Sequence, residues 1–328
     1  MTDVATGQAG TPSGDPLADD VVIAFQTVQS GARGRIVRLG TSVDTVLSSH
    51  TYPEVVKRVL GEAIALTAML GSQLKFDGKL ILQTNTDGPL RVVVVNYQTS
   101  GSFRGYASFD ADAIATLTAE RQERITPADL IGSGYMALTI DPGGDMERYQ
   151  GIVQIAGNSL SEAAQEYFRA SEQIASFIKL TVARVFAGGV WRWRAGGLMV
   201  QHLTAEGGHE VPERDDGAES GWEAEPAEEQ WRRVEALART VEDHELTDPM
   251  LTPERLLFRL FHEEGVRVAP EQTVQAKCGC TRDHVGMFIK QFKPEELADL
   301  REPDGTLVVT CEFCATPYRF TIEEFGGT

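Results

Sequence analysis

The sequence predicts an α+β protein in which an N-terminal mixed-sheet domain with helices is followed by a helical linker and a small C-terminal module with four cysteines. Three observations support this prediction. Strand patterns dominate the first half of the chain, with two main helical patterns between them. The composition shifts after Leu203 to a stretch rich in Glu, Asp, Gly, Ala and Pro. All four cysteines lie in the last fifty-one positions.

The composition limits the function classes. With 328 residues and 42% hydrophobic content, the chain is long enough for two domains and a large core. No apolar run approaches the roughly 20 residues that a membrane-spanning helix needs. The net charge of -18 argues against a nucleic-acid partner, which would require a basic face. Residues 1–20 lack the basic flank and apolar core of a signal peptide, so we expect a disordered tail and a cytoplasmic protein.

The first domain is expected to span residues 21–203. Its predicted strands are 21–25, 34–39, 79–84, 90–97, 103–109, 135–140, 149–155, 190–193 and 196–201. One helix is predicted to begin near Pro53, a favoured first-turn residue, and to end at Gly71 after apolar residues at helical spacing. A second helix is predicted after Ser159, because Ser159 and Glu162 have the spacing of a capping box.

The linker is expected to span residues 204–272. Its acidic part, residues 204–229, has few large apolar residues and is expected to be partly mobile. Pro226 is predicted to open an amphipathic helix, and Thr252 is predicted to cap a second one that starts at Pro253. Both helices must bury their apolar faces, and the first domain is the nearest partner.

The module expected at residues 273–328 carries the cysteines in two tight pairs, Cys278-Gly279-Cys280 and Cys311-Glu312-Phe313-Cys314. Four thiolates arranged in two pairs are a tetrahedral ligand set for Zn²⁺. So small a module cannot bury enough apolar surface to be firmly stable alone, whereas structural zinc contributes roughly 10–16 kcal/mol in comparable modules. We therefore predict one zinc ion per chain, bound by Cys278, Cys280, Cys311 and Cys314.

The same cysteines also fit a redox switch. Cytoplasmic thiols are normally reduced, so clustered cysteines favour metal binding or redox sensing over a structural disulfide. Peroxide attacks thiolates, a neighbouring thiol resolves the sulfenic acid, and loss of the metal removes the main stabilisation of the module. A second hypothesis is a binding or scaffold protein with a permanent zinc module. A third is a thiol oxidoreductase using Cys311 and Cys314, although this pair lacks the strand-then-helix setting of a thioredoxin-like site.

Other candidate residues carry weaker signals. His284 is the histidine nearest the cysteines and could compete for zinc, but four cysteines already complete the tetrahedron. Trp191 and Trp193 share one strand face, where core packing and substrate contact are the two alternatives. We find no nucleophile with a neighbouring base, so no enzymatic activity is expected.

With these residues in view, the chain resembles the 33 kDa chaperonin family, the redox-regulated heat-shock proteins 33. The spacing Cys278-x-Cys280 followed by Cys311-x-x-Cys314 matches the zinc motif of that family. Further segments match in the family's order, namely 50–53, 78–84, 104–107, 149–153, 167–173, 195–199 and 259–264. The resemblance covers about residues 21 to 328, and the tail and acidic stretch are peculiar to this chain.

The resemblance implies an ATP-independent holdase of the cytoplasmic stress response, which protects thermally unfolding and oxidatively damaged client proteins from aggregation. It implies that the reduced, zinc-bound form is monomeric and inactive. Oxidation would then form the disulfides Cys278–Cys280 and Cys311–Cys314, release zinc and unfold the module and linker, giving an active homodimer. Neither nucleic acid nor membrane is an expected partner.

Overall fold

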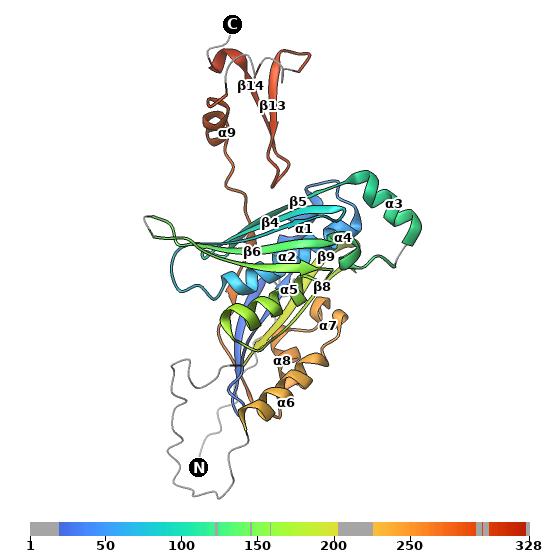
Figure 1. Cartoon of the computed structure of the whole chain (residues 1–328), viewed down its shortest axis with the longest axis vertical. Helices are drawn as coiled ribbons and strands as arrows, with labels where there is room; N and C mark the ends of the chain where they lie inside the picture. Colours follow the sequence, from blue (N-terminus) through green and yellow to red (C-terminus); the bar gives the residue numbers. More distant parts are fainter. Residues whose placement is uncertain are drawn as a thin grey trace, which may run out of the picture.

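The computed structural model describes residues 20–121, 124–144, 146–157, 159–202, 226–292, 297 and 302–325. Two six-stranded sheets form the body of the protein, and a two-stranded hairpin lies in the C-terminal module, which projects from that body (Figure 1). The α+β prediction is confirmed. The predicted tail up to residue 19 and residues 203–225 of the acidic stretch lie outside the described residues.

The two large sheets are built almost entirely from antiparallel pairs. Sheet A has the order β10-β1-β2-β9-β8, and β11 also pairs with β1. Its strands are β1 (Val21–Thr27), β2 (Arg33–Leu39), β8 (Ser176–Ala187), β9 (Val190–Gln201), β10 (Val266–Val268) and β11 (Gln272–Thr273). Sheet B has the order β12-β5-β4-β3-β6-β7. Its strands are β3 (Lys79–Thr86), β4 (Leu90–Gln98), β5 (Ser102–Phe109), β6 (Ser133–Asp141), β7 (Tyr149–Ala156) and β12 (Gln275–Ala276). Among the described strands, only β12 runs parallel to its neighbour, β5.

Helix α2 (Glu54–Gly71) lies between the two sheets and forms the centre of the core. It contacts β2, β8 and β9 of sheet A and β3, β4 and β5 of sheet B. From Val59 to Gly71 its residues are buried almost without interruption, because a helix between two sheets has hardly any solvent face. This helix was predicted, although Pro53 is its N-cap and not a residue of its first turn.

Several shorter helices complete the fold. They are α1 (Thr41–Ser48), α3 (Ala111–Arg121), α4 (Pro127–Ile131), α5 (Leu160–Tyr167), α6 (Ala227–Arg239), α7 (Asp243–Thr247), α8 (Pro253–Phe261) and α9 (Arg282–Ile289), with a π-helical turn at Phe168–Glu172 and a 3-10 turn at Ile322–Phe325. The capping box of Ser159 and Glu162 is confirmed, as is the cap of Thr252 on α8. Helix α3 was not predicted, because Ile114 is its one buried residue and it shows no apolar stripe.

The strands predicted at 190–193 and 196–201 are wrong in one respect, because both belong to the single strand β9. The glycines at positions 196 and 197 suggested a break, but Gly196 serves a different purpose. A Cβ atom there would collide with the carbonyl group of Leu246, so the absent side chain lets the linker approach the sheet. Trp193 is 5% exposed and packs in the core, whereas Trp191 is 59% exposed near the start of the strand, so core packing holds for only one of the two.

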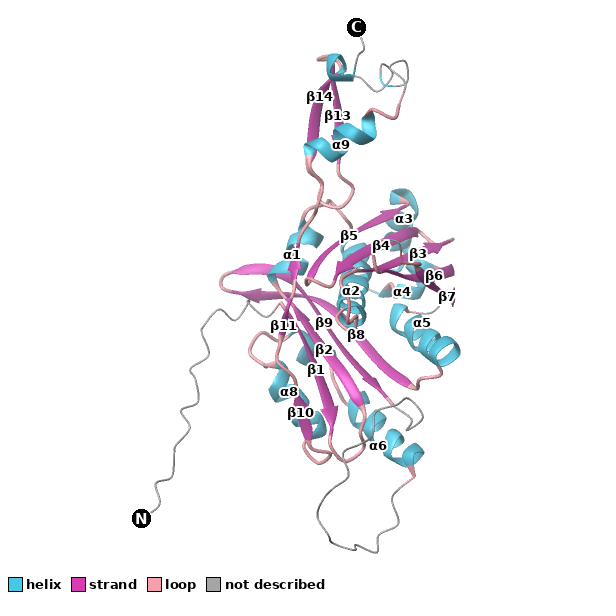
Figure 2. Ribbon diagram, turned by 90° about the vertical axis from the view of Figure 1, so that its left-hand side faces the viewer, coloured by secondary structure: helices cyan, strands magenta, loops and turns pink. Residues whose placement is uncertain are grey.

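The linker helices cover the outer face of sheet A (Figure 2): α6 contacts β8 and β9, and α8 contacts β2 and β10. Alternation along β1 decides which side chains they meet: Val22 faces α2, whereas Val21, Ile23 and Phe25 face the linker. The prediction that both amphipathic helices bury their faces on the first domain is confirmed. The linker side of this second core consists of Trp231, Val234, Ala238, Val241, Leu246, Leu256, Leu257, Leu260 and Phe261.

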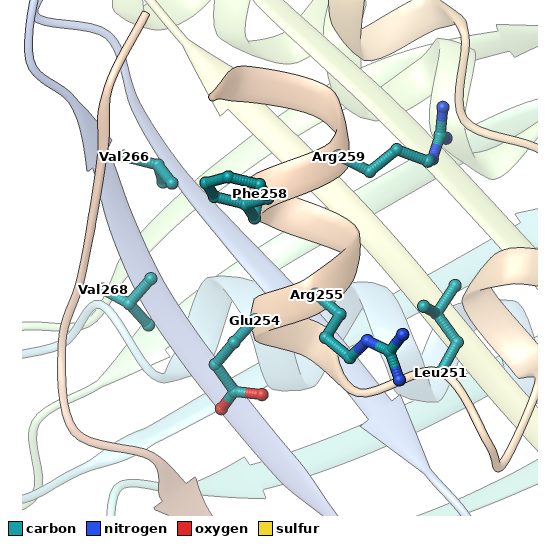
Figure 3. A pocket seen from close by; sticks show the side chains of 7 residues that line it. All are labelled: Leu251, Glu254, Arg255, Phe258, Arg259, Val266 and Val268. Carbon is teal, nitrogen blue, oxygen red and sulfur yellow. The ribbon is translucent and has the colours of Figure 1, made fainter. Parts of the chain in front are cut away.

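The opposite face of α8 is open. Together with β10 it borders a groove of about 610 Å³ lined by Leu251, Glu254, Arg255, Phe258, Arg259, Val266 and Val268 (Figure 3). Phe258 is 64% exposed in this groove, whereas Phe261, three residues later, is fully buried. Helix α8 therefore carries one phenylalanine on each side.

Candidate metal centre

A loop and a turn bring the four cysteines together. Cys278 and Cys280 lie between β12 and α9, and Cys311 and Cys314 lie between β13 (Thr306–Thr310) and β14 (Pro317–Thr321). The four Sγ atoms are all within 4.8 Å of one another. The Sγ atoms of Cys278 and Cys311 are 3.8 Å apart, and those of Cys280 and Cys314 are 3.3 Å apart. All four residues are half-buried free thiols.

This spacing fits a metal ion bound by four thiolates. Zinc–sulfur bonds of about 2.3 Å in a tetrahedron place the sulfur atoms about 3.8 Å from one another. The donor set of four cysteines is one that structural zinc sites use. The spacing and the donor set therefore both fit a Zn²⁺ ion bound by the four cysteines.

The local backbone shapes the second turn for this role. The N–H of Cys311 donates to the carbonyl oxygen of Thr316 at 3.0 Å, and the N–H of Ala315 donates to that of Cys311 at 2.8 Å. Ala315 has a φ of 55°, the left-handed conformation that a residue with a Cβ atom rarely adopts. These bonds fold the chain back so that Cys311 and Cys314 share one side of the turn.

The sulfur atoms differ in their electrostatic setting. Burial raises the pKa of the Cys280 thiol to about 12 and also raises the pKa of Cys311. Burial opposes ionisation of Cys314 as well, but hydrogen bonds from the side chain and main chain of Thr316 outweigh it and lower the pKa of Cys314 to about 7. A metal ion that binds all four thiolates must therefore displace protons, and its affinity depends on pH.

The described residues of the module form a small apolar core beside the β13–β14 hairpin. Its buried core consists of Ile289, Leu297, Leu307 and Phe320. Such a core is too small to stabilise a domain without a cross-link or a metal ion. Tyr318 adds hydrogen bonds from its hydroxyl group to the carbonyl oxygen and the Sγ atom of Cys280, both at 3.2 Å.

Three short strands tie the module to both sheets. β10 and β11 pair with β1 at the edge of sheet A, and β12 pairs with β5 at the edge of sheet B. The N–H of Lys277 then donates to the carbonyl oxygen of Phe103 at 2.9 Å, and Cys278 follows directly. The cysteine centre therefore begins one residue after the last main-chain bond to sheet B.

Two buried arginines of sheet A hold the linker between α7 and α8. Arg38 on β2 donates to the carbonyl oxygens of Asp248 and Leu251, and Arg194 on β9 donates to that of Thr247 at 2.8 Å. Both arginines are 1% exposed. Burying a guanidinium group without hydrogen-bond partners costs free energy. The docked linker supplies these partners, so the two arginines and the linker stabilise each other.

The structure supports the cysteine cluster that the sequence predicted and does not support a role for the nearby histidine in it. It brings together the four predicted cysteines, and the cluster of metal-binding side chains in the described part of the chain does not include His284. Sequence reasoning missed Arg38, Arg194 and Tyr318, whose partners are distant in the chain. No helix among the described residues is long and apolar enough to cross a membrane.

The comparisons with known proteins agree over nearly the whole chain. A family model described as "Hsp33 protein" matches residues 20–321. The "33 kDa chaperonin" of Caulobacter vibrioides strain NA1000 / CB15N is 41% identical over 319 residues, covering 97% of this chain and 98% of the relative. The protein of the same name from Pseudomonas fluorescens strain SBW25 is 34% identical over 293 residues, covering 89% and 87%. The crystal structure of the 33 kDa chaperonin from Thermotoga maritima has a similar fold, with a TM-score of 0.71, 22% identity and coverage of 94% and 97%.

Proposed function

Because the chain belongs to the Hsp33 family of chaperones, we propose that it is a redox-regulated, ATP-independent holdase of the cytoplasm. Its clients are thermally unfolding and oxidatively damaged proteins, which it keeps from aggregating. The observation that carries this proposal is the position of the four-cysteine cluster: it lies in a module with a small apolar core, and short strands join it to helices that cover an apolar sheet face.

In the reduced state, Cys278, Cys280, Cys311 and Cys314 hold one Zn²⁺ per chain. The ion supplies the stabilisation that the module core lacks. The linker helices remain docked on sheet A, the apolar face stays covered, and the protein is an inactive monomer.

Oxidation by a hydroperoxide converts the four thiolates into two disulfides. In each pair one thiolate attacks a peroxide oxygen, the O–O bond breaks, and a sulfenic acid and a water or alcohol form. The neighbouring thiol then displaces water from the sulfenic sulfur, so that one peroxide accepts two electrons for each S–S bond. We assign the bonds to Cys278–Cys280 and Cys311–Cys314, because the shortest loops close at the least entropic cost once the module loosens.

Loss of the metal ligands then unfolds the module and releases the linker. Departure of α6 and α8 uncovers apolar side chains of sheet A, among them Val21, Ile23, Phe25 and Leu198. An exposed apolar patch of this kind binds unfolded polypeptide and favours dimerisation of the active form. The net charge of -18 helps to keep the open form soluble.

The test combines a chromogenic zinc chelator with an aggregation assay on a thermally unfolding client. Reduced protein should contain about one zinc per chain and suppress no aggregation, whereas peroxide with mild heat should release the zinc and produce suppression that thiol reductant with zinc reverses. A matched variant with Cys278→Ser and Cys280→Ser should lose the metal. Equal suppression in both redox states, with zinc retained, would instead favour a binding protein with a permanent zinc module.

A further inference from the structure

Phe313 lies inside the Cys311–Cys314 turn but takes no part in the core of its own module, which Ile289, Leu297, Leu307 and Phe320 form. Its ring packs on sheet B. The guanidinium carbon of Arg104 lies 4.1 Å from the ring centroid of Phe313, and the ring of Tyr106 meets it edge-on at 4.9 Å between centroids and 82° between planes. An aromatic ring held by a cation and a second ring is a specific contact, not incidental packing.

The pattern of β5 makes this contact possible. Phe103, Gly105 and Ala107 face the core and are buried, so Arg104 and Tyr106, which alternate with them, point to the outer face of sheet B. Arg104 also donates from Nη1 to the Sγ atom of Cys278 at 3.8 Å. Arg104 therefore contacts Cys278 of the first pair and also Phe313, which lies between the cysteines of the second pair.

The same strand carries the main-chain connection to the module. Gly101 and Phe103 accept hydrogen bonds of 2.9 Å from the N–H groups of Gln275 and Lys277. The main-chain hydrogen bonds of β12 and the side-chain contacts with Phe313 are thus neighbours on β5. Both sets of contacts must break when the module leaves sheet B.

We infer that Arg104 and Tyr106 form a docking site for Phe313, which holds the reduced cysteine module on sheet B and keeps β12 paired with β5. They act as positioning residues: they set how readily the module separates from the first domain. The docking of Phe313 is a property of the reduced protein with its module on sheet B. Only the effect of this docking on zinc release and chaperone activation rests on the proposed function.

A different role for Arg104 would be to act on the Cys278 sulfur alone, as a nearby positive charge. The two roles differ at Tyr106 and Phe313, because Tyr106 contacts the phenylalanine ring and carries no positive charge that could act on the Cys278 sulfur. Under docking, Arg104→Gln, Tyr106→Leu and Phe313→Leu have the same effect, and Arg104→Gln adds little once Phe313 is Leu. Under a purely electrostatic role, Arg104→Lys restores the behaviour of the unmodified chain and Tyr106→Leu changes nothing.

The experiment measures amide hydrogen exchange in the full-length, reduced, zinc-loaded protein. Exchange at Lys277, whose N–H bonds to Phe103, reports docking, and exchange at Cys311, whose N–H bonds to Thr316, reports the integrity of the module. Arg104→Gln and Tyr106→Leu should each accelerate exchange at Lys277 by about 3- to 30-fold, the scale of one aromatic or cation–π contact. Exchange at Cys311 and the zinc content should stay unchanged. Arg91→Gln, on the neighbouring strand β4 and paired with Asp110 at the surface, is the matched control.

The same variants are then treated with peroxide in the presence of the zinc chelator. Docking predicts faster zinc release for Tyr106→Leu as well as for Arg104→Gln, and the unmodified rate for Arg91→Gln. Unchanged exchange at Lys277 in Tyr106→Leu, or independent effects of Arg104→Gln and Phe313→Leu, would overturn the inference. Altered docking in a protein that never suppresses aggregation would refute the proposed function and leave the docking site standing.

Discussion

Arg38 on β2 donates a hydrogen bond of 2.5 Å to the main-chain carbonyl oxygen of Leu251, which lies just before α8. The same guanidinium group bonds to the carbonyl oxygen of Asp248. The acceptors are backbone atoms, so the contact depends on the path of the linker and not on its side chains. This contact makes Arg38 a direct probe of linker docking.

We predict that Arg38→Met weakens the docking of α7 and α8. The carbonyl oxygens of Asp248 and Leu251 lose their hydrogen bonds to the guanidinium group, and a hydrogen bond to a charged group is worth roughly 1.5–3 kcal/mol. Exchange of the amides from residue 247 to 261 should therefore accelerate by about tenfold or more. The matched control is Arg33→Met at the exposed start of the same strand. Equal protection of the linker in both variants would show that Arg38 does not hold it.

A second prediction concerns the two phenylalanines of α8. Phe261 is fully buried and stacks on Phe25 with ring centroids 5.5 Å apart, whereas Phe258 lies in the open groove. Phe261→Leu should loosen α8 and give measurable aggregation suppression in the reduced protein, because a poorly filled core site costs roughly 1 kcal/mol or more. Phe258→Leu should leave the reduced protein inactive. Activation by Phe258→Leu but not by Phe261→Leu would contradict the release of the linker as the activating step.

The features that the sequence predicted well are local. Ser159 with Glu162, and Thr252 with Pro253, signal helix starts within a few residues, and the structure shows both. The cysteines were found for the same reason, since each pair is its own motif. The chain-wide resemblance then supplied the family, which the comparisons show.

The features that the sequence did not predict depend on distant partners. β10 has three residues, and nothing in Val266-Arg267-Val268 shows that it pairs with Phe25 to Thr27. β11 spans Gln272–Thr273, where the linker and the module were expected to meet. Arg38 and Arg104 look like ordinary polar positions of alternating strands until the folded chain places Leu251 and Phe313 beside them. Long-range contacts of single side chains leave no periodic signal.

Metal removal tests the dependence of the module on its centre. We predict that chelation of zinc from the reduced protein collapses amide protection between residues 278 and 320, because four buried apolar residues cannot replace the metal. Protection of α2 and the strands around it should persist, since that core contains no cysteine. Adding zinc with reductant should restore protection. Full protection of Cys311 and Leu307 in metal-free protein would show that the module is stable alone.

The last prediction is a pH dependence centred on Glu62 of α2. Desolvation raises the pKa of its carboxyl group from 4.5 to about 8; the negative charge of Asp243 on α7 adds to the rise, and Arg58 opposes it. Asp243 also pairs with Lys179 of β8 at 3.0 Å, so these four groups share one electrostatic environment.

Between pH 4.5 and about 8 the folded protein holds a proton that the unfolded chain has lost, so stability is full below this window and falls as pH rises through it. Ionised Glu62 would then repel Asp243 and weaken the docking of α7. Glu62→Gln should flatten the decline of the urea midpoint with pH, whereas Glu54→Gln, at the exposed start of the same helix, should keep it. Equal slopes for the two variants would show that Glu62 stays ionised in the folded protein.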